Sequence, residues 1–156
     1  MKRLTLMVFL LALAYVLSSC GQAGAPASPT VLPTGIVPVT SSGVEDQASF
    51  LAALQEAGAS VELVEPVDQI FFAPQGTIIA VNGADAQVFE YESEQALEAE
   101  AAQVAPDGGS IGTSMVTWVD TPHFYRAGRI IVLYVGSDTS TLELLNGILG
   151  PQFAGR

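Results

Sequence analysis

Basic residues are scarce in this chain, and lysine is absent beyond its second residue. Lys2 and Arg3 are followed by only three cations, Arg126, Arg129 and Arg156, against sixteen Asp and Glu residues. A strongly acidic surface is repelled by phosphate backbones, so we expect no nucleic-acid partner. The lack of lysine also excludes Schiff-base catalysis, a P-loop and a Ser–Lys dyad.

Cysteine occurs once, at the end of an apolar run. The uncharged stretch from Leu4 to Leu17 is shorter than the ~20 residues that a membrane-spanning helix needs. The following residues, Leu17-Ser18-Ser19-Cys20, resemble the lipobox that ends the signal peptide of bacterial lipoproteins. The resemblance implies that residues 1–19 are removed, that Cys20 carries diacylglycerol and palmitate, and that the protein is anchored at the extracytoplasmic face of the cell membrane.

The segment after Cys20 predicts a tether followed by one domain. Residues 20–43 carry no charge and are rich in Pro, Gly, Ser and Ala, so they cannot bury enough surface to fold. The remaining residues, 44–156, are enough for a single domain with its own core.

Apolar periodicity and turn residues predict alternating helices and strands in this domain. We expect helices at 45–57 and 94–104 and a last helix after Asp138, with strands at 61–63, 77–81, 86–92, 113–119 (resuming at 123–126) and 129–135. Asn82-Gly83 is a strong hairpin signal, and strands joined by tight turns are antiparallel. The prediction is an α+β fold of order α-β-β-β-α-β-β-α, a two-layer sandwich with helices on one sheet face.

Few residues suit catalysis. Ser110 lies in a G-x-S-x-G match, but a helix precedes it and a strand follows, the reverse of the hydrolase arrangement. Glu90 and Glu92 could be the paired carboxylates of a glycosidase, although a solvated strand face explains them better. The one histidine, His123, cannot build a metal site alone. We therefore expect no metal, no cofactor and no enzymatic activity; a small envelope hydrolase using carboxylates or Ser110 is the alternative.

Aromatic and basic residues gather late in the chain. Trp118, His123, Tyr125, Arg126 and Arg129 are the candidate binding residues, as a rim that captures an anion or a partner surface. The competing interpretation is a hairpin whose aromatics are core and whose arginines pair with nearby acids. We expect a non-enzymatic domain that binds a protein or envelope component; the alternative to binding is an assembly subunit that pairs through a sheet edge. The oligomeric state stays open.

The final hairpin carries a second resemblance. The stretch 121–129, followed by 130–136 and preceded by the hairpin Val81-Asn82-Gly83, is similar to small domains of uncharacterised bacterial lipoproteins. The resemblance spans about 44–156 and implies a succession of helices and hairpins. It implies no activity.

Overall fold

The computed structural model describes residues 43–156. The predicted signal peptide, Cys20 and the tether as far as residue 42 lie outside the described residues. Within 43–156, none of the helices combines the length and the apolar character needed to cross a bilayer.

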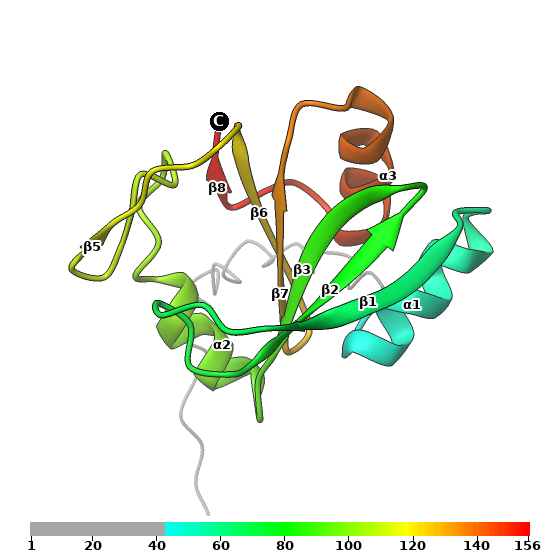
Figure 1. The fold of residues 1–156 in the computed structure, drawn as a ribbon. Coiled ribbons are helices and arrows are strands. Elements are labelled where there is room, and N and C mark those ends of the chain that lie inside the picture. Colours follow the sequence, from blue (N-terminus) through cyan, green and yellow to red (C-terminus); the bar gives the residue numbers. More distant parts are fainter. Residues whose placement is uncertain (1–42) are drawn as a thin grey trace, which may run out of the picture. The chain divides into compact units, whose positions relative to one another are not determined.

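A six-stranded antiparallel sheet forms the centre of the domain (Figure 1). Its strand order is β1-β2-β3-β7-β6-β8, so β7 lies beside β3 although β6 precedes it in the chain. The strands are β1 (Val61–Val67), β2 (Gly76–Val81), β3 (Ala84–Glu90), β6 (Pro122–Ala127), β7 (Ile130–Val135) and β8 (Ala154–Gly155). Two further short strands, β4 (Ser110–Ile111) and β5 (Ser114–Met115), pair with each other.

Three helices complete the domain, and each begins at a capping side chain. They are α1 (Gln47–Glu56), α2 (Glu94–Ala101) and α3 (Thr139–Leu149). Asp46, Ser93 and Asp138 each accept a hydrogen bond from the backbone N–H three residues later. Such a bond satisfies one of the N–H groups that a helix start leaves without a partner, which explains where each helix begins.

Apolar side chains are buried on both faces of the sheet. Successive strand residues point to opposite faces, and in β7 Ile130 and Val132 belong to one buried cluster whereas Ile131 and Leu133 belong to another. α1 and α3 pack in the first cluster, and α2 packs in the second together with the β4–β5 hairpin. The α+β class and the antiparallel sheet are confirmed. The two-layer arrangement with helices on one face is not confirmed. β7 is apolar on both of its faces, so both faces of the sheet have to be covered.

The element order also differs from the prediction in detail. The short strands β4, β5 and β8 were not expected, and α2 ends at Ala101 rather than at residue 104. The strand predicted over 113–119 is wrong, because only Ser114–Met115 pair and the chain from Val116 to Thr121 is irregular. The alternation of apolar residues there reflects side chains that turn alternately toward the domain and toward solvent, with no paired strand in the described part of the chain.

The turn between β2 and β3 is confirmed. Asn82 and Gly83 both have positive φ, 52° and 87°, as a two-residue hairpin turn with this sequence requires. Gly58 likewise follows α1 with a φ of 85°, in the position of a helix-ending glycine.

Candidate functional site

The aromatic residues predicted as one contact site point to opposite faces of the sheet. Tyr125 belongs to the cluster of α1 and α3, and His123 stacks on Tyr134 of that cluster with 6.1 Å between ring centroids. Trp118 packs in the other cluster, 5.7 Å from the ring of Phe124. His123 and Tyr125 lie on one face of β6 and Arg126 on the other, whereas Trp118 packs from the β5–β6 loop on the face of Arg126, so the predicted residues do not share one surface.

His123 is buried, and both of its ring nitrogens are engaged. Its Nδ1 lies 2.6 Å from Oε1 of Gln152, and its Nε2 lies 3.1 Å from the carbonyl oxygen of Gly136. The ring therefore links the β6–β7 hairpin to the segment before β8. A histidine held in this way is not oriented as a base for Ser110.

Tyr125 is fully buried, and its hydroxyl has no hydrogen-bond partner among the described residues. Burial, with a smaller contribution from Tyr134, raises the pKa of the Tyr125 phenol. A buried polar group without a partner costs about 1–3 kcal/mol of folding free energy. The Tyr125 hydroxyl therefore lowers the stability of the domain.

Replacing Tyr125 by phenylalanine is expected to raise the free energy of unfolding by about 1 kcal/mol, because it removes that unpaired hydroxyl. Urea unfolding followed by tryptophan fluorescence measures the change. Tyr134→Phe is the matched control: the Tyr134 hydroxyl accepts a hydrogen bond from the Asp138 N–H at 3.3 Å, so its loss should lower stability. Equal losses in both variants would contradict this account.

Arg126 points to the α2 face and is paired. Its Nη1 lies 2.6 Å from Oε2 of Glu98, and its guanidinium lies 5.2 Å from the ring centre of Phe153. Both partners of the ion pair are partly exposed, so the pair adds little stability. The ion pair with Glu98 does neutralise Arg126, a residue that the sequence had suggested as a binder of an anionic ligand.

Arg129 joins the β6–β7 turn to the start of α1. Its Nη2 lies 2.6 Å from Oε1 of Glu90 and 3.6 Å from Oδ2 of Asp46, and its backbone N–H donates to the Glu45 carbonyl at 2.9 Å. The pKa of Asp46 is lowered mainly by the backbone N–H and hydroxyl of Ser49, with Arg129 adding to the effect. Arg129, like Arg126, therefore follows the competing interpretation in which arginines pair with acids.

Trp118 connects two loops. Its indole Nε1–H donates to the Gly108 carbonyl at 2.7 Å, and its ring meets Phe71 edge to face at 6.0 Å. Phe71 belongs to the β1–β2 loop and Trp118 to the β5–β6 loop. The contact holds the two loops together beside the α2 face of the sheet.

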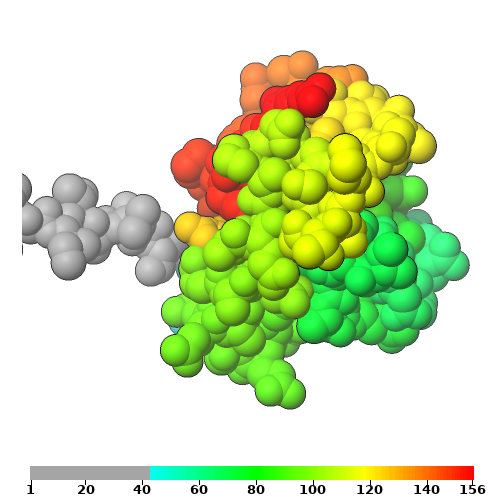
Figure 2. All heavy atoms as spheres, turned by 90° about the vertical axis from the view of Figure 1, so that its left-hand side faces the viewer, coloured from blue at the N-terminus to red at the C-terminus, as the bar shows by residue number. Residues whose placement is uncertain are grey.

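Three large apolar side chains are almost fully exposed: Ile70 in the β1–β2 loop, Met115 in β5 and Val119 in the β5–β6 loop. Ile70, Met115 and Val119 are 95%, 92% and 99% exposed, and we call them the apolar loop surface. In Figure 2 the yellow segment near residues 113–122 borders the green segment near residues 65–75. Sequence reasoning missed this surface, because Met115 and Val119 were assigned to one face of a strand. The available signal was that the apolar residues of 113–119 have no neighbouring predicted strand joined to them by a tight turn.

A hollow of about 460 Å³ lies next to Trp118, and we call it the Trp118 hollow. Its polar and aromatic lining residues are Asp107, Thr117, Trp118, Asp120, Thr121 and Arg156. Nη2 of Arg156 lies 3.9 Å from Oδ2 of Asp107. Oδ1 of Asp120 accepts the Thr121 N–H at 2.7 Å, which fixes the orientation of that carboxylate.

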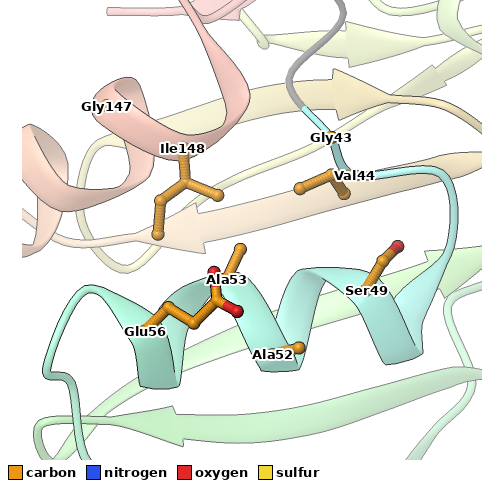
Figure 3. Close-up of a pocket in the computed structure, with 8 residues that line it drawn as sticks. All are labelled: Gly43, Val44, Ser49, Ala52, Ala53, Glu56, Gly147 and Ile148. Atoms are coloured by element: carbon orange, nitrogen blue, oxygen red, sulfur yellow. The ribbon is translucent and has the colours of Figure 1, made fainter.

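A second hollow, of about 410 Å³, lies between α1 and α3 (Figure 3). Figure 3 shows Ile148 of α3 facing Ala53 and Glu56 of α1, with Val44 at one end. Small apolar side chains dominate this groove, and no set of polar groups converges on it. We assign it no chemistry.

The residues considered for catalysis are separated by their contacts. Ser110 belongs to β4 and pairs with Met115 through the backbone. Glu90 is bound to Arg129, whereas Glu92 is exposed beyond the end of β3. Among residues 43–156, no group of three His, Cys, Asp or Glu side chains is placed to hold a metal ion.

Among the described strands β1 forms one edge of the sheet, and it carries features that discourage strand pairing. Leu63 and Val64 are exposed there, but the register shifts between Leu63 and Glu65, and Pro66 removes a backbone donor. Bulges, charges and proline are the usual protection of an edge strand. The geometry therefore supports assembly through this edge less well than binding at the apolar loop surface.

Comparisons of the chain with models of protein families, with curated proteins and with solved structures found no match.

Proposed function

We propose that the protein is a membrane-anchored lipoprotein of the extracytoplasmic face whose domain binds a protein or other envelope component and does not catalyse a reaction. The lipobox-like sequence Leu17–Cys20 supports the anchor and the location. The observation that carries the binding function is the apolar loop surface formed by Ile70, Met115 and Val119.

Large apolar side chains that are almost fully exposed on two loops in contact, and on the strand before one of them, favour an interaction surface. Isolated exposed apolar residues are ordinary, whereas neighbouring ones mark sites where another surface removes them from water. Burial of apolar area contributes about 25 cal/mol per Å², so three such side chains offer substantial binding energy. The acidic residues elsewhere in the chain do not offer binding energy from the burial of apolar area.

The loops that bear this surface are held in place before any partner arrives. The Phe71–Trp118 contact and the Trp118–Gly108 hydrogen bond connect the β1–β2 loop, the β5–β6 loop and the turn before β4. A preorganised surface loses less conformational entropy on binding, which favours affinity. In this proposal Trp118 contributes to the contact region by holding the two loops in place.

Binding at this surface is tested by serine substitutions of its most exposed residues. The double variant Ile70→Ser, Val119→Ser should fold normally, because both side chains are already in water. We expect it to recover the bound envelope component at least tenfold less well than the unchanged chain, a loss of about 1.4 kcal/mol or more. The measurement is quantitative mass spectrometry of proteins and glycans that co-purify with the full chain from envelope extracts.

Leu63→Ser is the matched control, since Leu63 is also exposed but lies on the β1 edge. Recovery should be unchanged in this variant. If Leu63→Ser abolishes recovery and the double variant does not, the interaction runs through the sheet edge and the proposed surface is wrong. Equal recovery with all three chains also contradicts it.

A further inference from the structure

We propose that the Trp118 hollow binds an uncharged sugar residue of a glycan. This inference rests on the proposed function, because it names the chemical class of the envelope component that the domain holds. It concerns a site beside the apolar loop surface rather than that surface itself.

The lining of the hollow matches the two kinds of surface that a sugar ring presents. A pyranose has apolar C–H groups on its ring faces and hydroxyls around its rim. Trp118, one of the lining residues, carries an apolar aromatic side chain. Carboxylate oxygens accept hydrogen bonds, and threonine hydroxyls both donate and accept them, so Asp120 and Thr117 can serve a rim of hydroxyls.

The polar groups of the hollow are oriented and still have capacity for a ligand. Asp120 uses Oδ1 for the Thr121 N–H, and Asp107 uses its own Oδ1 for the Gly109 N–H at 2.9 Å. Each ionised carboxylate has two acceptor oxygens, so Oδ2 of Asp120 remains for a hydroxyl. Fixed orientation of an acceptor lowers the entropic cost of binding.

The charges around the hollow disfavour an anionic ligand. Asp107 and Asp120 repel an anion, and Arg156, whose Nη2 lies 3.9 Å from Oδ2 of Asp107, only partly neutralises that carboxylate. A purely apolar ligand would remove these groups from water without replacing their hydrogen bonds. A ligand with many hydroxyls and no charge avoids both the repulsion of an anion and the loss of hydrogen bonds. The volume of about 460 Å³ lies within the ~300–1,000 Å³ typical of small-molecule sites.

The single tryptophan of the chain makes the site directly observable, since Trp118 lines the hollow and is the only source of indole fluorescence. The full chain, in a detergent without a sugar headgroup, is titrated with the neutral trisaccharides maltotriose, cellotriose and chitotriose (the N-acetylated form). We expect a saturable change in Trp118 fluorescence with at least one of them. Asp120→Asn should weaken it at least tenfold, because the variant keeps an acceptor for Thr121 N–H but loses the carboxylate charge.

Asp85→Asn is the matched control and should bind as the unchanged chain does. Asp85 is exposed in β3 next to the β2–β3 turn, which lies on the other side of the domain from β5 in Figure 1. No fluorescence change with any neutral trisaccharide, or an equal loss in both variants, overturns the proposal. Binding of deacetylated, cationic chitotriose alone also overturns it.

The serine variant of the apolar loop surface separates this inference from the proposed function. If the trisaccharides do not bind but Ile70→Ser, Val119→Ser still loses its envelope component, the proposed function stands and the sugar site is wrong. If the trisaccharides bind and the serine variant recovers everything, the sugar site stands and the apolar surface is wrong.

Discussion

Replacing Cys20 by serine is expected to abolish acylation of the protein. The lipid of a lipoprotein is joined through the sulfur of the lipobox cysteine, and Cys20 is the only cysteine of the chain. Each buried CH₂ of an acyl chain contributes about 0.8 kcal/mol, and two or more chains make attachment stable. Incorporation of labelled palmitate should therefore fall to background, and the mass of the N-terminal peptide should lose the lipid.

Ser18→Ala is the control for this experiment, since it keeps a small residue at a position that the lipobox fills with small residues. It should incorporate palmitate as the unchanged chain does. A cell-derived protein whose residue 20 is unacylated, or whose Met1 is still in place, would contradict the anchor and with it the proposed location.

Replacing Gly128 by alanine should lower the free energy of unfolding by about 2–5 kcal/mol. Gly128 forms the β6–β7 turn with a φ of 50°, a left-handed conformation that costs other residues about 1–2 kcal/mol. A Cβ at this position would also lie 2.3 Å from the carbonyl oxygen of Glu45 and 2.4 Å from its Cα. Backbone atoms cannot yield as a flexible side chain can, and such overpacking costs roughly 1–3 kcal/mol more.

Gly58→Ala separates the two causes. Gly58 also has a positive φ, 85°, but a Cβ there would meet nothing within 4 Å. The free energy of unfolding of Gly58→Ala should therefore fall by only about 1–2 kcal/mol. Urea unfolding of both variants measures the difference, and equal losses would show that the packing of residue 45 against the turn does not matter for stability.

The Gly128 contact also explains the position of Arg129. The close approach of the Glu45 backbone allows the Arg129 N–H to donate to the Glu45 carbonyl and brings the guanidinium to Asp46 and Glu90. In the sequence Arg129 lies more than eighty residues from Asp46, so no local pattern connects them. Because of this separation, the prediction of a cationic rim did not anticipate that Arg129 pairs with Asp46.

Local features of the domain were predictable because they depend on neighbouring residues. Asn82-Gly83 forms the expected turn because these residues accept positive φ at little cost. Ser93 caps α2 because its side chain reaches the Ala96 N–H three residues away. The apolar run from Ile130 to Val135 is a strand, as expected.

The strand predicted over 113–119 shows the limit of the same reasoning. Alternating polarity indicates which side chains are buried and which are exposed, but it does not show that the segment pairs with another strand. Here Val116 and Trp118 turn toward the cluster around Phe124, while Met115 and Val119 turn to solvent. No strand within residues 43–156 pairs with the segment after Met115, so the pattern arises without a ladder of hydrogen bonds.

The sequence by itself determined the acidic character of the chain, the lipobox-like signal, the antiparallel α+β class and the turns and caps that lie within a few residues of one another. The tertiary structure alone decided that β7 lies between β3 and β6, that α2 covers the face opposite α1 and α3, and that Phe71 meets Trp118. Turns and caps follow from short-range sterics and hydrogen bonds. Strand order and loop contacts follow from packing summed over residues far apart in the chain, which no single stretch encodes.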